Sequence, residues 1–160
     1  MATKSSVDRV REALLAAGHD DTVTEFPAGT RTAADAAAAV GCTVAQIAKS
    51  IVFRAGDRAV VVIASGANRV DARKVAEALG VAVRRADADF IRDRTGFAIG
   101  GVAPVGHLAP PLLLFDHDLL ALHPIYAAAG SPSHVFSTEA ETLVRITGAP
   151  VADIRQDGAG

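Results

Sequence analysis

The sequence predicts a single compact domain of the α+β or mixed α/β class, in which helices flank a mixed, largely antiparallel sheet. The chain has 160 residues, enough for one domain with one hydrophobic core. Its expected strands are joined partly by hairpins and partly by helices, rather than in strict strand–helix alternation. We expect this domain to span residues 1–154, and residues 155–160 to form a loose C-terminal tail.

Capping residues and glycines mark the expected helices. Ser5 and Ser6 can cap a first helix that Gly18 ends. Thr32 and Asp35 have the spacing of a capping box ahead of an alanine-rich helix. Similar signals predict further helical segments at 43–46, from 68 or 71 to 80, at 87–91, in a turn from 116, and at 138–148.

Short runs of β-branched and other apolar residues predict the strands. Residues 49–54 and 58–64 are separated by Gly56-Asp57, which is typical of a hairpin turn. The run at 112–115 is apolar throughout, as in a central strand. Further strands are expected at 22–26, 81–85, 125–128 and 134–136.

Composition argues against several classes of protein. The formal net charge of −2 disfavours a protein that coats nucleic acid electrostatically, although it leaves room for a local basic patch. Six Phe and one Tyr are too few for a platform that stacks single-stranded bases. The sequence has neither a signal-peptide pattern nor an apolar run of membrane-spanning length, so we expect a cytoplasmic protein without membrane contact.

We expect no metal and no cofactor. Cys42 is the only cysteine, and the five histidines lack the spacing of metal ligands. The glycines form neither a Walker loop nor a dinucleotide-binding fingerprint. Cys42 lies at a helix start, where a thiolate would be favoured, but a small buried packing residue is the simpler role.

Residues 96–107 combine four glycines with apolar side chains. Phe97, Ile99 and Val102 would be out of place in a flexible polar linker. This composition favours a buried loop whose backbone approaches a ligand closely, and Gly100-Gly101 could aim successive N–H groups at an anion or a polarised carbonyl. A tight structural crossover between strands explains the glycines equally well.

Lys49 lies at the start of an expected strand and is one of only three lysines. Period-two alternation places it on one face with Ile51 and Phe53. If that face is internal, the ammonium group enters a partly desolvated space and seeks an anion. The alternative is an edge lysine whose tip lies in water.

Other candidate site residues lie near turns. His107 and His134 follow loops rich in glycine or proline and could line a cleft. Ser65 and Ser131 lie in or before turns, without the G-x-S-x-G pattern of a nucleophile elbow. We therefore do not expect a serine-hydrolase triad.

Four segments follow one another with the spacing of one known family: Ala48–Phe53, Val70–Ala76, Thr95–Gly106 and Leu143–Ile154. They include a strand lysine and a T-G-(aromatic)-x-x-G-G-x-x-P-x-G loop, and Thr30 stands ahead of the alanine-rich helix. The pattern covers nearly the whole chain and resembles the YbaK-type aminoacyl-tRNA editing domains. These domains are related to the editing insert of bacterial prolyl-tRNA synthetases.

The resemblance implies a free-standing deacylase that hydrolyses the ester of mischarged tRNA without a cofactor. Its substrates would be tRNAs of the prolyl type carrying a small amino acid. Its partners would be that tRNA and, in some settings, prolyl-tRNA synthetase. The protein would be a monomer or a homodimer.

The resemblance also implies which residues form the site. Lys49 matches the functional lysine of the family, and we expect it to hold the 3′-terminal phosphate or ribose. Gly100 and Gly101 match the pocket loop, where their N–H groups would stabilise the oxyanion. A methyl group on Gly101 would then occupy space that the aminoacyl group needs. Further substrate-binding residues are expected to be Thr30, Ser50, Ser65, Pro104, Gly106, Ser131 and His134.

The sequence leaves the edited amino acid open. One branch of the family, which prefers alanyl-tRNA, carries asparagine directly after the lysine, where this chain has Ser50. Members that act on cysteinyl-tRNA tend to carry an acidic residue near the position of Val135. Two other functions also stay open: a non-catalytic relative that binds aminoacyl-tRNA or a synthetase, and a small-ester or amide hydrolase on the same fold.

Overall fold

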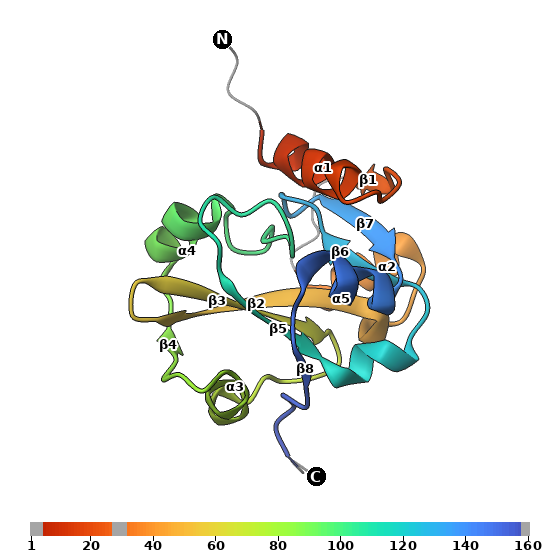
Figure 1. Ribbon diagram of the computed structural model, residues 1–160. Coiled ribbons are helices and arrows are strands. Elements are labelled where there is room, and N and C mark those ends of the chain that lie inside the picture. The colour runs from red at the N-terminus through yellow and green to blue at the C-terminus, as the bar shows by residue number, and fades with distance from the viewer. Residues whose placement is uncertain (1–4, 27–31, 158–160) are drawn as a thin grey trace.

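One mixed sheet organises the computed structural model, which describes residues 5–26 and 32–157 (Figure 1). The strand order is β1-β7-β6-β2-β3-β5-β8, and β4 pairs with one end of β2. The pairs β1–β7, β6–β7, β2–β3 and β2–β4 are antiparallel, whereas β2–β6, β3–β5 and β5–β8 are parallel. The strands are β1 (Val23–Glu25), β2 (Ile47–Ala55), β3 (Arg58–Ser65), β4 (Arg84–Arg85), β5 (Leu112–Asp116), β6 (Ile125–Ala128), β7 (His134–Thr138) and β8 (Val151–Ala152).

Helices cover both faces of this sheet, which confirms the predicted fold class. The α-helices are α1 (Ser6–Ala16), α2 (Ala33–Val40), α3 (Ala72–Leu79), α4 (Ala88–Thr95) and α5 (Ala140–Thr147), and the 3-10 helices are η1 (Val44–Gln46) and η2 (His117–Ala121). Figure 1 shows α1 and α4 on one side of the central β2–β3 hairpin and α3 on the other. None of the helices in residues 5–26 and 32–157 is both long enough and apolar enough to cross a membrane.

The alternation of side chains along β3 divides the core into two layers. Val61 and Ile63 pack in the larger layer with residues of α1, α4, α5 and the glycine-rich loop, residues 96–107. Val60 and Val62 pack in the smaller layer with Val75 of α3. Because both faces of β3 are buried, this strand is apolar along nearly its whole length.

Several local predictions are confirmed in detail. Ser5 caps α1, and its side chain accepts a hydrogen bond from the Asp8 amide. The amide of Asp35 donates to Thr32 Oγ1 at 3.1 Å, and the amide of Thr32 donates to Asp35 Oδ2 at 3.2 Å. This is the predicted capping box at the start of α2.

Other local predictions are wrong at their boundaries. The expected strand at 81–85 contains only Arg84 and Arg85, because the Val81 amide donates instead to Ala76 O at the end of α3. Helix α4 continues to Thr95, beyond the expected end at Ile91. The strand β8 was not predicted.

The start of α5 also differs from the prediction. The helix begins at Ala140 with Glu139 as its N-cap, whereas Thr138 was expected to cap it. Thr138 is instead the last residue of β7, where it pairs with Ile125. Its hydroxyl lies 2.9 Å from His19 Nε2, so it is not available to the helix.

Residues 155–157 differ from the loose tail that the sequence predicts. The amide of Gln156 donates to Arg69 O at 2.8 Å, and Arg155 forms a bridge with Val70. Lys74 of α3 contacts Asp157 at 2.8 Å. These residues are therefore held against the start of α3.

Candidate functional site

An opening in the sheet positions the candidate site. On the edge of β2 that faces away from β3, β6 pairs only with Ile47 and Ala48, and β4 pairs only with Phe53 and Arg54. The four residues between them, 49–52, are flanked by no strand on this edge within the described ranges. The Gly66 amide donates to Ile47 O, so Ile47 and every second residue after it direct their backbone N–H and C=O groups towards β3. The backbone N–H and C=O groups of Ser50 therefore point the other way, towards this open edge.

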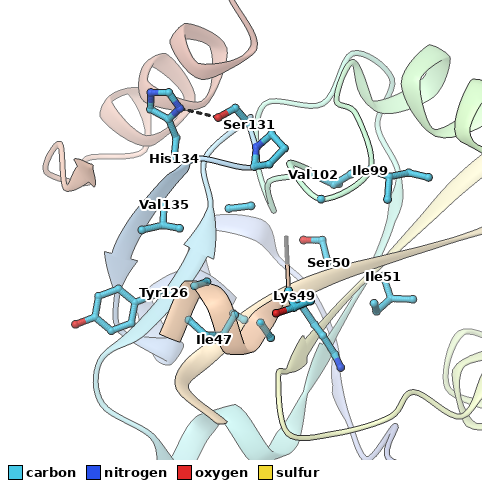
Figure 2. Close-up of a pocket in the computed structure, with 17 residues that line it drawn as sticks. Ile47, Lys49, Ser50, Ile51, Ile99, Val102, Tyr126, Ser131, His134 and Val135 are labelled. Atoms are coloured by element: carbon cyan, nitrogen blue, oxygen red, sulfur yellow. Dashed lines mark hydrogen bonds between the residues drawn. The ribbon is translucent and has the colours of Figure 1, made fainter. Parts of the chain in front are cut away.

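A cavity of about 270 Å³ lies at this open edge (Figure 2). Its lining combines β2 with α2, the glycine-rich loop, β6, and the turn into β7. Most of these side chains are small or apolar, and no acidic side chain is among those that the structure describes there. The lining residues are Thr32, Ala33, Ala36, Ile47, Ala48, Lys49, Ser50, Ile51, Ile99, Gly100, Val102, Tyr126, Ala128, Ser131, Pro132, His134 and Val135.

Helix α1 holds the glycine-rich loop in place. Arg9 donates from Nη2 to Gly96 O at 2.7 Å and from Nε to Gly106 O at 3.3 Å, which ties the two ends of the loop to one side chain. The same guanidinium lies 5.0 Å from the centre of the Phe97 ring. The loop is buried, as the sequence predicts, and it also forms part of the pocket wall, because Val102 is buried and lines the pocket.

The two adjacent glycines of the loop have different surroundings. Gly100 lines the pocket with φ +90, and a Cβ added there would meet Pro132 only at 3.8 Å. Gly101 packs against the turn before β7, where an added Cβ would lie 2.7 Å from Ser131 Cα. The Gly101 amide already donates to Ala98 O at 3.0 Å, so it does not point freely into the pocket as expected.

Lys49 is half-buried and lies on the pocket lining. Its Nζ donates to the backbone oxygen of Asn68 at 2.6 Å. Burial lowers the pKa of Lys49, the nearby Asp116 carboxylate opposes this, and Arg69 lowers the pKa further. Figure 2 shows the side chain extending away from the Ser131–His134 pair.

The contact of Lys49 depends on residues that sequence reasoning missed. Asn68 Nδ2 donates to Asp116 Oδ2 and to Asp118 Oδ2, both at 2.8 Å. The Ser65 amide also donates to Asp116 Oδ2, at 2.9 Å. Asp116 is almost fully buried, and its only sequence signal is an acidic residue that directly follows an apolar strand. This network fixes the loop whose carbonyl holds the Lys49 ammonium group.

Ser131 and His134 form a hydrogen-bonded pair on the opposite wall. Ser131 Oγ lies 2.6 Å from His134 Nδ1, as the dashed line in Figure 2 shows. His134 Nε2 lies 3.6 Å from Glu25 Oε2, on the exposed side of the ring. If the ring carries its proton on Nε2, Nδ1 accepts the hydrogen bond from the Ser131 hydroxyl. Both predicted residues are thus brought to the pocket.

Ser50 differs from these residues because its hydroxyl is unpaired. The Oγ atom is buried and has no hydrogen-bond partner among the residues that the structure describes. The same residue lines the pocket. Buried hydroxyl groups in proteins nearly always have a partner, so this atom requires an explanation.

Three predicted binding residues lie elsewhere. The Ser65 hydroxyl donates to Ala45 O at 2.7 Å and is buried behind β2. Pro104 is buried in the loop, and Gly106 packs against α1, where an added Cβ would lie 3.2 Å from Arg9 O. These residues shape the loop and the sheet rather than the described pocket wall. Thr30 lies outside the described residues.

His107 does not line the pocket either. Its Nε2 lies 2.8 Å from Ala103 O, and its ring packs edge-on against Phe97 with centroids 5.8 Å apart. No cluster of three or more His, Cys, Asp or Glu side chains suited to a metal ion occurs in the parts of the chain that the structure describes.

The comparisons with known proteins show the family and agree with this fold. Residues 27–146 match the model of the aminoacyl-tRNA editing domain. The chain therefore belongs to the aminoacyl-tRNA editing domain family. An uncharacterised relative from Bacillus subtilis (strain 168), YwhH, is 31% identical over 127 residues, which cover 79% of this chain and 81% of that protein.

Solved structures with the same fold cover almost the whole chain. One is a protein put forward as a trans-editing enzyme for prolyl-tRNA synthetase, with 42% identity and a TM-score of 0.90, covering 97% of this chain and 99% of the other. A second, the hypothetical protein APE2540, has 30% identity and a TM-score of 0.85, covering 92% of this chain and 99% of the other. The resemblance that the sequence predicted is confirmed at the level of family and fold.

Proposed function

We propose that this protein is a free-standing deacylase that hydrolyses the ester bond of mischarged tRNA of the prolyl type carrying a small amino acid. The single observation that carries the proposal is the apolar pocket of about 270 Å³ at the open edge of β2, beside Lys49. Its family and its 42% identity to a protein put forward as a trans-editing enzyme for prolyl-tRNA synthetase support the same activity.

The pocket can supply what ester hydrolysis needs. Water attacks the ester carbonyl, the bond to the ribose oxygen breaks, and the proton from water passes to that oxygen as the free amino acid leaves. The open β2 edge and the Gly100 backbone supply polar groups near a bound carbonyl, and a well-aligned donor contributes about 3 kcal/mol to such a step. Gly101 is not assigned as a donor, because its amide is directed to Ala98 O.

Lys49 has a positioning role in this proposal. Lys49 is among the lining residues, and its ammonium group is held by a neutral carbonyl rather than a carboxylate. A phosphate or ribose oxygen of the 3′-terminal nucleotide can replace or share that contact. Fixing the ribose fixes the ester relative to the pocket, which accelerates hydrolysis through proximity.

A panel of mischarged tRNAs tests the proposal. The protein should deacylate tRNA of the prolyl type charged with a small amino acid and leave correctly charged prolyl-tRNA intact. Lys49→Ala should abolish this turnover while the protein stays folded, and Lys49→Arg should fail as well, because a planar guanidinium does not replace a compact ammonium group. Lys74→Ala is the matched control, because this lysine lies on α3 outside the pocket lining.

Three outcomes would contradict the proposal. Normal turnover by folded Lys49→Ala protein would remove the assigned role of this residue. Binding of the charged tRNA without any turnover would favour a non-catalytic relative, and hydrolysis of free amino-acid esters in preference to tRNA-linked ones would favour a small-ester hydrolase.

A further inference from the structure

The unpaired Ser50 hydroxyl extends the proposed function to the identity of the amino acid. A buried hydroxyl that lacks a partner destabilises a protein relative to one that is hydrogen-bonded. The Oγ atom of Ser50 is buried and has no hydrogen-bond partner among the residues that the structure describes. Such an unsatisfied group in a pocket wall is typical of a contact that a ligand completes.

The neighbouring serine on β3 shows the contrast. Ser65 pairs in register with Ala48 on the adjacent strand, and its hydroxyl donates to Ala45 O at 2.7 Å. Ser50 lies on β2, two residues after Ala48. Its side chain is also a serine hydroxyl, yet it has no acceptor among the described residues. No hydrogen bond therefore restrains rotation about its Cα–Cβ bond, and the hydroxyl can turn towards a ligand that fills the pocket.

The size of the pocket indicates which part of the substrate reaches Ser50. A tRNA is far larger than a cavity of about 270 Å³, so the ribose and the ester stay near its mouth. The amino-acid side chain is the part that enters most deeply. The side chain is therefore the portion of the substrate placed to meet the Ser50 hydroxyl once that hydroxyl turns towards the pocket.

The charge of the lining indicates the chemistry of that side chain. No acidic residue lines the described part of the pocket. A cationic ligand group at Ser50 would therefore lose its hydration without gaining a counter-charge. An uncharged hydroxyl can instead donate to Ser50 or accept from it, while its carbon atoms contact apolar neighbours such as Ala48 and Val102.

We propose that Ser50 is a specificity-determining residue that selects aminoacyl groups bearing a hydroxyl, threonine or serine, over apolar groups of the same size. The inference rests on the deacylase function proposed above. A pocket that hydrogen-bonds a substrate hydroxyl discriminates against the apolar isostere, because binding the isostere leaves the protein group unpaired. Size alone cannot make this distinction between threonine and valine.

The same tRNA charged with threonine or with valine provides the test. The wild-type protein should hydrolyse the threonyl ester with a kcat/KM about 10- to 100-fold higher than the valyl ester. Ser50→Ala should lower the value for the threonyl ester by a similar factor and leave that for the valyl ester unchanged or raised. Its Tm should be equal to or above that of the wild type, because an unsatisfied buried group has been removed.

Ser65→Ala is the matched control. It removes a satisfied hydroxyl from the adjacent strand, so it should lower the Tm while keeping the threonine-to-valine ratio. Equal kcat/KM values for the two esters in the wild type would overturn the inference. An equal fall for both esters in Ser50→Ala would also overturn it, since the hydroxyl would then contact a group common to all substrates.

A binding measurement separates this inference from the proposed function. The probes are 3′-deoxyadenosine derivatives in which threonine or valine is linked through a stable 3′-amide, titrated by calorimetry. A threonyl preference that Ser50→Ala abolishes supports the inference even if neither tRNA ester is hydrolysed, an outcome that would remove only the proposed deacylase activity. Equal affinities of the wild type for the two amides would overturn the inference.

Discussion

Two successive residues of β2 have opposite environments because side chains alternate along a strand. Lys49 points to a polar loop, where the Asn68 carbonyl accepts its hydrogen bond at 2.6 Å. Ser50 points to the other face, where its hydroxyl has no partner in the described ranges. In the function that we propose, one strand segment would therefore contact the ribose or phosphate of the substrate with one residue and its amino acid with the next.

Another single residue, His107, makes the stability depend on pH. Burial lowers the pKa of His107, the carbonyl of Ala103 opposes this, and nearby Arg9 lowers the pKa further. The folded state therefore resists protonation more than the unfolded state, whose histidine titrates near pH ~6.5. The contribution to stability is full above that pH and is lost as the pH falls from there through the folded-state pKa.

The prediction is a smaller acid sensitivity in a His107→Phe variant. The wild type should lose more Tm than the variant between about pH 7.5 and about pH 5.5, because phenylalanine keeps an aromatic ring beside Phe97 but cannot bind a proton. Thermal unfolding at the two pH values measures this difference. Identical losses in the two proteins would mean that His107 is as easily protonated in the folded state as in the unfolded chain.

At the residue scale, the sequence predicts on which face of a strand a polar side chain lies, but not which group it hydrogen-bonds. Alternation correctly separates Lys49 from Ser50, and the family pattern points to both. The partner of Lys49 is a carbonyl 19 residues away, held by the buried carboxylate of Asp116. That contact depends on the path of the loop after β3, which no local pattern encodes.

At the scale of elements, the glycine-rich loop is defined by its contacts with α1 and with the turn before β7. Arg9 fixes both ends of the loop, and Gly101 fits closely against the backbone of Ser131. The sequence predicts a buried loop from its apolar residues, and this holds for Phe97 and Val102. The sequence cannot predict which glycine lines the pocket and which packs against the protein backbone, because these contacts are made with segments more than 25 residues away in the chain.

The two glycines should respond differently to alanine. Gly101→Ala places a methyl group 2.7 Å from Ser131 Cα, so the loop and the turn must separate. We expect a loss of about 1–3 kcal/mol of stability, as in other overpacked sites, together with reduced turnover because the pocket wall moves. This differs from the sequence-based expectation, in which the methyl group blocks the aminoacyl group and stability is largely kept.

Gly100→Ala is the matched comparison. Its φ of +90 makes alanine unfavourable by about 1 kcal/mol, but the added Cβ meets no atom closer than 3.8 Å. Thermal unfolding and deacylation of one mischarged tRNA, measured on the same preparations, should show a larger loss of Tm for Gly101→Ala. A Gly101→Ala protein with wild-type Tm and impaired turnover would restore the original expectation.

The C-terminal segment gives a second prediction at this scale. Lys74 Nζ contacts Asp157 at 2.8 Å, Asp153 at 3.2 Å and Arg155 O at 2.7 Å. These carboxylates raise the pKa of Lys74, with Asp157 as the main cause. Lys74→Ala should speed amide hydrogen exchange at Gln156 and leave the Tm nearly unchanged, because exposed ion pairs contribute little to global stability.

Lys74→Arg is the control for this segment, since it keeps the positive charge. It should retain most of the protection at Gln156, whose amide donates to Arg69 O. Unchanged exchange at Gln156 in the alanine variant would mean that the backbone bridge between Val70 and Arg155 holds the segment without help from Lys74.

At the scale of the whole molecule, the pocket exists because the sheet is incomplete. β6 and β4 each cover only one end of β2, and the glycine-rich loop and the turn before β7 enclose the space between them. The sequence predicts most strands of this sheet, yet not the gap, because a gap follows from the lengths and register of strands that are distant in the chain. β8 was not predicted because its two residues are too few to show the two-residue period of a strand.

The whole-molecule arrangement leads to a last prediction, that deacylation does not require a metal ion. The described residues contain no cluster of His, Cys, Asp or Glu side chains placed to bind one. An aminoacyl ester is an activated bond, so water, a fixed carbonyl and hydrogen-bond donors suffice for its hydrolysis.

The substrate should be a charged acceptor-stem hairpin, because its short duplex folds without Mg²⁺ and chelation then acts on the protein alone. Turnover should be the same before and after exhaustive treatment with EDTA, and addition of Zn²⁺ or Mg²⁺ should not raise it. A reproducible loss in EDTA that either ion reverses would reveal a metal site that these residues do not suggest.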